Sequence, residues 1–270
     1  MVRVNQFIAL GAVLALTLLT THTAFAGPAG SSYPLTVAGS VAGSPGNLWV
    51  TDPNGGGLNL GEYTYQVFGP EDAEYRFCAS WDGGAEVPVA VKSFGDTFIW
   101  WSKFDGATTE SRLFGSSVTD IPTVMDADGD GGDEIVVVRD EGAGGMHWYV
   151  RNTVDTEVSF VIDDFGFGPA GTTPAPGNWD TQSAGDEPAV TQATVSGKLW
   201  ISQQNSGVSY ELFGAAGDQN VAFTDNGQTR PGVGQKVVVG NVFDFKTESG
   251  QERLLMGPAA TTDPIGNCNL

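Results

Sequence analysis

An acidic, glycine-rich stretch holds the side chains best suited to chemistry in this sequence. It reads DADGDGGDEIVVV from residue 126 to residue 138; its first three aspartates stand at alternate positions, and glycines stand at 129, 131 and 132. Glycine lets the backbone curl, so these carboxylates can converge. Calcium is a hard cation that takes roughly six to eight oxygen ligands from carboxylates, carbonyls and water. The spacing predicts a calcium site whose ligands are Asp126, Asp128, Asp130, the carbonyl of Gly132 and Glu134.

The alternative for this stretch is a solvated acidic turn without a metal. The stretch resembles the start of an EF-hand, but an EF-hand closes with a glutamate at its twelfth position, where this sequence has Val137. Residues 135 to 138 are β-branched throughout, which favours a strand over a helix. We therefore expect a calcium loop that leads directly into a β-strand.

The first 26 residues have the features of a signal peptide. Arg3 supplies a positive start, residues 7 to 19 are apolar, and residues 24 to 26 read Ala-Phe-Ala, a small-x-small cleavage signal. No later stretch reaches the roughly 18 apolar residues that a membrane span needs. We expect residues 27–270 to form a single domain that is secreted, periplasmic or at the cell surface, without membrane insertion.

The composition excludes several classes of partner and favours one fold class. The formal net charge is −20, with 32 acidic residues against 12 lysines and arginines. A nucleic-acid-binding surface needs clustered basic residues, so nucleic acid is not an expected partner, and neither is an anionic membrane. The 38 glycines and the lack of long amphipathic helical patterns predict many short strands joined by turns.

Two cysteines, Cys78 and Cys268, follow the expected cleavage site. In an oxidising compartment an even pair readily forms a disulfide. We expect this pair to be bonded, which ties the C-terminal tail to an early part of the chain. The alternatives are two unpaired thiols or an intermolecular link.

Three sequence marks recur in the same order along the chain. Phe-Gly recurs at Phe68, Phe114, Phe165 and Phe213, at steps of 46, 51 and 48 residues. A Gly-x-x-Trp mark stands at residues 46–49, 145–148 and 197–200, and a Gly-x-charged triplet opens the apolar runs at residues 84–91, 132–138, 185–190 and 234–239. Recurrence at a period of about 50 residues is the signature of a repeat architecture.

Each repeat fits three or four strands, which is one blade of a β-propeller. Five apolar runs occur, and the first and last units are incomplete, as they would be if the two chain ends shared a blade. A closed ring also leaves no exposed sheet edge at either end. We expect an all-β propeller of about five blades, each with three to four antiparallel strands. A pair of β-sandwiches is the alternative, although sandwiches do not require a repeating sequence.

Residues 114–138, FGSSVTDIPTVMDADGDGGDEIVVV, resemble the FG-GAP and VCBS-type repeats of bacterial exported β-propellers. Residues 165–190 are similar to a degenerate copy, and the resemblance spans about 45 to 250. In such repeats the acidic loop binds calcium and orders the first hairpin of its blade. The resemblance thus implies calcium bound by Asp126, Asp128, Asp130, the Gly132 carbonyl and Glu134.

The acidic pattern decays in the other copies. Residues 80–86 keep only Asp82 and Glu86, and the copy at residues 225–236 contains Arg230. The copy that follows Phe165 keeps Asn178 and Asp180. We expect one strong calcium site and at most one weak one.

Tryptophans are candidates for binding sugars as well as for packing. A tryptophan at the same place in every repeat indicates packing between sheets. Trp81 and Trp179 stand outside the repeated mark, in loops beside Asp82 and Asp180. We therefore expect these two indoles to lie at the surface and to bind ligand.

Catalysis has little support in the sequence. His147 is the one histidine beyond the expected cleavage site, and no Gly-x-Ser-x-Gly motif is present. We expect a non-enzymatic, calcium-binding module that binds glycans or an extracellular protein partner. The alternatives are a propeller glycoside hydrolase, which needs only two carboxylates, and a purely structural envelope component.

Overall fold

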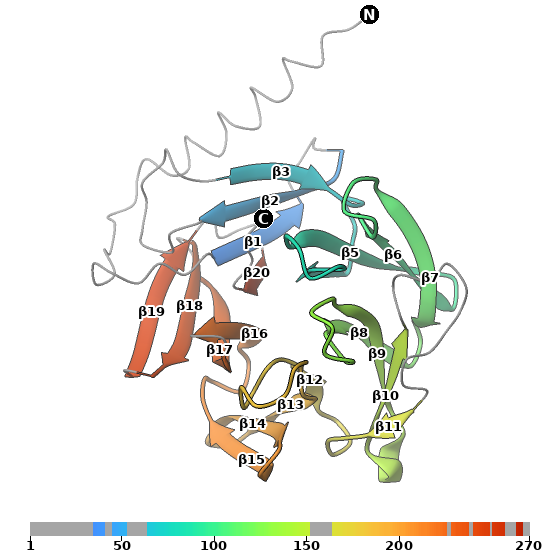
Figure 1. The fold of residues 1–270 in the computed structure, drawn as a ribbon. Coiled ribbons are helices and arrows are strands. Elements are labelled where there is room, and N and C mark those ends of the chain that lie inside the picture. The colour runs from blue at the N-terminus through green and yellow to red at the C-terminus, as the bar shows by residue number, and fades with distance from the viewer. Residues whose placement is uncertain are drawn as a thin grey trace, which may run out of the picture.

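Among the residues that the structure describes, 20 strands form five four-stranded antiparallel sheets, which stand in a ring (Figure 1). The structure is a computed structural model and describes residues 35–40, 45–52, 64–151, 164–225, 228–237, 240–248, 250–256 and 263–266. The predicted five-bladed β-propeller is confirmed, and the sandwich alternative is wrong. Residues 1–26 lie outside the described residues, so the signal peptide stays a prediction.

We number the blades in chain order and give their strands from the centre of the ring outward (Figure 1). Blade 1 consists of β20 (Asp263–Gly266), β1 (Leu35–Ser40), β2 (Asn47–Asp52) and β3 (Thr64–Phe68). Blade 2 consists of β4 (Tyr75–Ala79), β5 (Val87–Phe94), β6 (Thr97–Ser102) and β7 (Glu110–Ser116). Blade 3 consists of β8 (Asp120–Met125), β9 (Glu134–Asp140), β10 (Met146–Arg151) and β11 (Phe165–Gly166).

The remaining two blades follow the same plan. Blade 4 consists of β12 (Thr173–Pro174), β13 (Ala189–Thr194), β14 (Gly197–Gln204) and β15 (Gly207–Leu212). Blade 5 consists of β16 (Gln219–Asp225), β17 (Gln228–Val237), β18 (Gly240–Thr247) and β19 (Gly250–Met256). A short 3-10 helix, η1 (Gly142–Gly144), joins β9 to β10. Within the described ranges, none of the helical structure is both long and apolar enough to cross a membrane.

The second strand of a blade lies between its neighbours and is buried on both faces. Residues 135–138 of β9 and residues 89–91 of β5 are each at most 2% exposed. Burial on both faces removes the usual alternation of polar and apolar residues, which is why these strands are continuous apolar runs. In blades 2, 3 and 4 the Gly-x-charged mark lies where the entrance loop meets this buried strand, whereas in blade 5 residues 234–236 lie inside β17.

The Phe-Gly and Gly-x-x-Trp marks are joined by a hydrogen bond within each of the first four blades. The indole N–H of the third strand donates to a phenylalanine carbonyl at the end of the same blade. The distances are 3.3 Å from Trp49 to Phe68, 3.0 Å from Trp100 to Phe114, 2.9 Å from Trp148 to Phe167 and 3.0 Å from Trp200 to Phe213. These four indoles are at most 2% exposed, so the predicted packing role of the repeated tryptophans is confirmed.

In blade 3 the acceptor is Phe167, so the choice of Phe165 as the repeat mark was wrong. Both residues precede a glycine in the sequence FGFG, but Phe165 lies inside β11, paired with Trp148.

The glycine of the Phe-Gly mark lets two blades approach closely. A Cβ on Gly115 would lie 2.5 Å from Val137 of the next blade, and one on Gly214 would lie 2.5 Å from Val233. Such distances are too short for carbon atoms, so any larger residue would push the blades apart. The mark therefore fixes the spacing between successive sheets.

The two ends of the chain meet in blade 1, as expected. Strand β20 pairs antiparallel with β1 and completes a sheet whose other three strands come from the start of the domain. Ile265 of β20 and Cys78 of β4 pack against the same apolar cluster, which contains Trp49 and Phe68. No cysteine among the described residues is free. Cys268 lies outside those residues, so its disulfide with Cys78 stays a prediction.

Blade 5 differs from the sequence-based expectation. Residues 225–236 were expected to form a degenerate loop before an apolar strand at residues 234–239. Instead, Asp225 and Gln228 pair directly, and β17 already begins at Gln228. The reason is that this copy lacks the acidic insert, so its first two strands continue toward each other as a hairpin.

Candidate functional site

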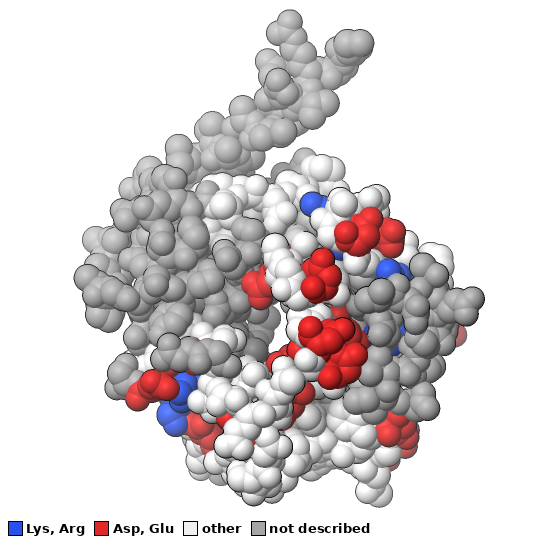
Figure 2. Space-filling view, in the orientation of Figure 1, with Lys and Arg blue, Asp and Glu red and all other residues white. Residues whose placement is uncertain are grey.

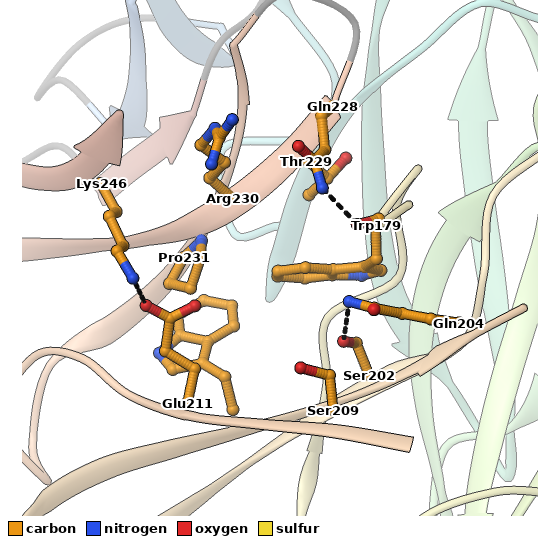
Figure 3. Close-up of a pocket in the computed structure, with 11 residues that line it drawn as sticks. Trp179, Ser202, Gln204, Ser209, Glu211, Gln228, Thr229, Arg230, Pro231 and Lys246 are labelled. Atoms are coloured by element: carbon orange, nitrogen blue, oxygen red, sulfur yellow. Dashed lines mark hydrogen bonds and ion pairs between the residues drawn. The ribbon is translucent and has the colours of Figure 1, made fainter. Parts of the chain in front are cut away.

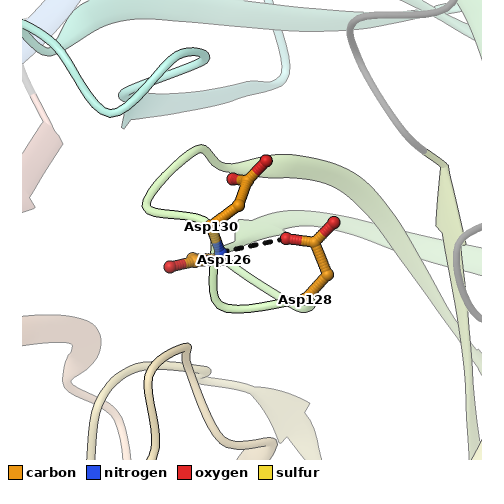
Figure 4. Close-up of side chains that lie close together, drawn as sticks. All are labelled: Asp126, Asp128 and Asp130. Carbon is orange, nitrogen blue, oxygen red and sulfur yellow. Dashed lines mark hydrogen bonds between the residues drawn. The ribbon is translucent and has the colours of Figure 1, made fainter.

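The calcium loop, residues 126–133, connects β8 to β9 in blade 3. Asp126, Asp128 and Asp130 each offer a carboxylate oxygen, and these oxygens all lie within 4.8 Å of one another (Figure 4). Asp128 and Asp130 are exposed, while Asp126 is partly buried. Acidic side chains also gather near the middle of the face shown in Figure 2. The structure thus brings together the three aspartates that the sequence predicted as metal ligands.

Backbone N–H groups of the same loop hold these carboxylates. Gly129 and Gly131 donate to the two oxygens of Asp126 at 2.8 and 3.1 Å, and Gly132 donates to Asp130 at 2.8 Å. Gly129 and Gly131 have φ values of 79° and 91°, in the left-handed region that favours glycine. The interleaved glycines therefore form the turn that points the carboxylates toward a common centre.

Glu134 lies at the base of the loop rather than among the converging aspartates. It is 3% exposed, and its Oε2 accepts a hydrogen bond of 2.8 Å from the N–H of Ala127. Glu187 makes the equivalent contact in blade 4, where it accepts from the N–H of Trp179 at 2.6 Å. This glutamate therefore closes the loop in both blades. Metal binding by Glu134 and by the carbonyl of Gly132 stays a prediction.

The calcium loop is electrostatically unfavourable without a cation. Burial raises the pKa of Asp126, and the charges of Asp128 and Asp130 raise it further, against the hydrogen bonds from Gly129 and Gly131 that lower it.

The same causes act more strongly on Glu134. Burial, together with the three aspartates, raises its pKa to about 8. A divalent cation at this point would offset the repulsion and favour the charged forms of Asp126 and Glu134. The donor set, all oxygen, is the set that calcium prefers.

Two further acidic residues, Asp133 and Asp186, link the loops of successive blades. The N–H of Asp133 donates to the carbonyl of Ser80 in blade 2 at 2.6 Å, and its carboxylate accepts from the N–H of Ser80 at 2.6 Å. Asp186 makes the same pair of bonds with Asp126, at 2.6 and 3.2 Å. Burial is the main cause that raises the pKa of both carboxyls to about 7.

The sequence analysis missed this role of Asp133 and Asp186. The signal was present, because both residues belong to the recurring Gly-x-charged triplet. A residue that recurs at the entrance to each buried strand indicates a contact shared by successive blades.

The loop of blade 4 keeps Asn178 and Asp180, and the sequence left open whether this degenerate copy holds the one weak calcium site. Asp180 instead accepts hydrogen bonds from the N–H groups of Gln182 at 2.9 Å and Asn205 at 2.6 Å. Asn178 accepts from Thr181 at 2.9 Å. Within the described ranges, Asp126, Asp128 and Asp130 are the one group of three acidic side chains that converge. The weak site stays a prediction that this geometry does not favour.

The expectation that Trp81 and Trp179 lie at the surface was wrong. Each indole is 4% exposed, because its loop folds back between two blades. Trp81 packs against Phe104 with ring centroids 4.9 Å apart, and Trp179 packs against Trp200 at 5.8 Å. Neither ring can act as an exposed stacking platform.

Trp179 nevertheless lines a pocket between blades 4 and 5, which we call the 4/5 pocket (Figure 3). Blade 4 contributes Trp179, Trp200, Gln204 and Glu211 to its walls, and blade 5 contributes Arg230 and Lys246. The sequence analysis identified Trp179 as a ligand-binding candidate but identified none of the other residues of this pocket.

Comparisons with known proteins leave the family open. Neither a scan against protein-family models nor a search of curated proteins finds a match to this chain. The five-bladed propeller is shown by the structure, and the FG-GAP and VCBS-type identity of the repeats stays a prediction.

Proposed function

We propose that this protein is an exported, calcium-stabilised β-propeller of the FG-GAP or VCBS type. In this proposal it is a non-enzymatic module that binds a glycan or an extracellular protein. The observation that carries the proposal is the convergence of Asp126, Asp128 and Asp130 in one loop, where burial and the two neighbouring charges raise the pKa of Asp126. Such a loop is unfavourable as a solvated turn and favourable as a calcium site.

Calcium acts in this proposal by ordering the contact between blades. Asp126 holds the calcium loop through its carboxylate, while its backbone bonds to Asp186 of blade 4. Asp133, at the end of the same loop, bonds to Ser80 of blade 2. A cation held by the loop therefore stabilises the positions of three successive blades.

The residues that line the 4/5 pocket favour a binding role over glycoside hydrolysis. A glycosidase of the usual kind places two carboxylates roughly 5 to 9.5 Å apart across the scissile bond. The described lining of this pocket offers one carboxylate, that of Glu211, and it is ion-paired with Lys246. A pocket open to ligand also favours a binding module over a purely structural component.

Isothermal titration with calcium tests the proposal. We expect the wild type to bind calcium with release of protons, and Asp128→Asn to lose most of the affinity, because this change removes a charge without changing the shape of the side chain. Asp105→Asn is the matched control, since Asp105 accepts backbone N–H bonds in a turn between β6 and β7 and is not part of the converging group.

The proposal is wrong if the wild type shows no calcium binding, or if Asp128→Asn and Asp105→Asn bind calcium as well as the wild type does.

A further inference from the structure

An open, polar space lies between blades 4 and 5. The equivalent space between blades 2 and 3 is filled by side chains. Strand register makes the two places equivalent, because Trp100 pairs with Arg112 across β6 and β7, and Trp200 pairs with Glu211 across β14 and β15. Counting four residues on from each tryptophan gives Phe104 in blade 2 and Gln204 in blade 4.

Blade 2 closes this space with a stack of side chains. The indole N–H of Trp81 donates to Ser102 Oγ at 2.8 Å, and Phe104 packs on Trp81. The guanidinium of Arg112 covers the Phe104 ring at 4.1 Å from its centroid. Phe104 is only 7% exposed, so no room remains for a ligand.

Blade 4 has polar residues at the same places and leaves the space open. Gln204 stands where Phe104 stands, Glu211 replaces Arg112, and all three of Gln204, Glu211 and Trp179 line the 4/5 pocket. Trp179 Nε1 is buried and has no hydrogen-bond partner among the described residues, unlike Trp81 Nε1. An unpaired buried donor costs free energy, which a ligand acceptor would recover.

The charges that border the pocket are already paired within the protein. Lys246 forms an ion pair with Glu211, and Figure 3 shows this pair on the side of the pocket opposite Trp179. Arg230 lies 3.3 Å from both Asp225 and Glu248. An anionic ligand would have to break these pairs and would enter a protein with a net charge of −20. The electrostatics therefore favour a neutral ligand.

We propose that the 4/5 pocket binds the terminal residue of a glycan, as a neutral sugar ring. This inference rests on the binding role proposed above. Trp179 and Trp200 are buried beneath the pocket, so the ligand is held by hydrogen bonds rather than by stacking: Trp179 Nε1–H and the Gln204 amide face the pocket and can bond to the ring hydroxyls. Residues of both blades bound the pocket, so we take its ligand to be a single ring at the end of a chain.

Binding of the full-length, calcium-loaded protein to an array of neutral and acidic glycans tests this inference. We expect the wild type to bind neutral glycans and Gln204→Phe to lose about tenfold or more in affinity, because the phenyl ring fills the pocket as Phe104 fills its counterpart. The melting temperature of Gln204→Phe should stay at or above that of the wild type, since the same residue packs well in blade 2.

A second pair of variants separates binding from packing. Trp179→Phe keeps an aromatic ring but removes the unpartnered N–H, so we expect weaker glycan binding. Trp81→Phe makes the same chemical change in blade 2, away from the 4/5 pocket, and should bind glycans as the wild type does.

Three results would overturn the inference in different ways. If Gln204→Phe and Trp179→Phe bind the same glycans as strongly as the wild type, the site lies elsewhere, although the proposed binding function stands. If only acidic glycans bind, the neutral ligand is wrong. If the wild type binds calcium in the titration above but no glycan on the array, the pocket is not a sugar site, and the calcium-stabilised module remains.

Discussion

Burial and mutual repulsion determine which acidic side chains near the calcium loop carry charge. Glu134, with a pKa raised to about 8 mainly by burial, and Asp133 and Asp186, raised to about 7 by the same cause, hold protons near neutral pH in the calcium-free fold. The unfolded chain releases those protons at much lower pH, because its carboxyls have ordinary pKa values. These residues therefore couple calcium binding to pH.

We predict that calcium affinity rises between about pH 6 and pH 9. A folded-state pKa that is raised for a carboxyl makes the calcium-free protein less stable as pH rises through the interval from the unfolded value to the folded one. Calcium favours the ionised carboxylates and displaces their protons, so its binding to the folded protein strengthens as pH rises through the folded-state pKa values of about 7 and 8. Isothermal titration in buffers of different ionisation enthalpy measures both the affinity and the number of protons released.

A calcium affinity that stays constant over this pH range, with no protons released, would contradict the assignment of raised pKa values to these residues.

At the scale of elements, each entrance loop positions the loop of its neighbour. The loop of blade 4 packs on the calcium loop through Gly185 and Asp186, and the N–H of Asp186 donates to the carbonyl of Asp126. The calcium loop reaches blade 2 in the same way, through Asp133 and Ser80. The proposed calcium site thus depends on residues that are not among its proposed ligands.

We predict that Gly185→Ala weakens calcium binding by about tenfold without changing any proposed ligand. A Cβ at Gly185 would overlap the carbonyl of Asp126 and would lie 3.0 Å from the Cα of Gly129. The calcium loop must move to admit that methyl group, because backbone atoms cannot rotate away. Gly217→Ala is the matched control, because nothing lies within 4 Å of a Cβ built there. Titration of the two variants with calcium should separate them, and equal affinities would show that the blade 4 loop does not position the site.

At the scale of the whole molecule, the ring closes because β20 from the end of the chain joins β1 from its start. Each blade then has a neighbour on both sides, and no blade is left with one face unpacked. Glycines such as Gly115 and Gly214 fix the close spacing of the blades, and the entrance loops hold them together at one face. A divalent cation in one loop therefore stabilises the ring beyond a single blade.

The repeated marks were sufficient to predict the ring, because each mark makes one contact that recurs from blade to blade in most of the ring. The indole bond from Trp100 to Phe114 is an example. Contacts that differ between blades were harder to predict. Trp179 lies in a loop, and the sequence does not show that this loop folds between two blades. The spacing of Glu134 fits a calcium ligand, but its hydrogen bond to Ala127 becomes visible only once the loop is folded.

Part of the 4/5 pocket could have been predicted from the sequence. The copies can be aligned on Trp100 and Trp200, and this alignment shows glutamine where blade 2 has Phe104. A comparison of the copies by their acidic loops alone does not show that Gln204 replaces the phenylalanine. The partner residues on blade 5 could not be found in this way, because that blade has Phe243 in place of the tryptophan and no acidic insert.

Thermal unfolding with calcium and with EDTA tests the central claim most directly. At a calcium concentration about 100 times the dissociation constant, binding to the folded state adds about 2.7 kcal/mol. That is a rise of roughly 5 to 10 °C in melting temperature for a domain of this size. We predict this rise for the wild type, and we predict that Asp128→Ala melts near the EDTA-treated wild type with or without calcium. Wild-type samples that melt at the same temperature in calcium and in EDTA would contradict the account.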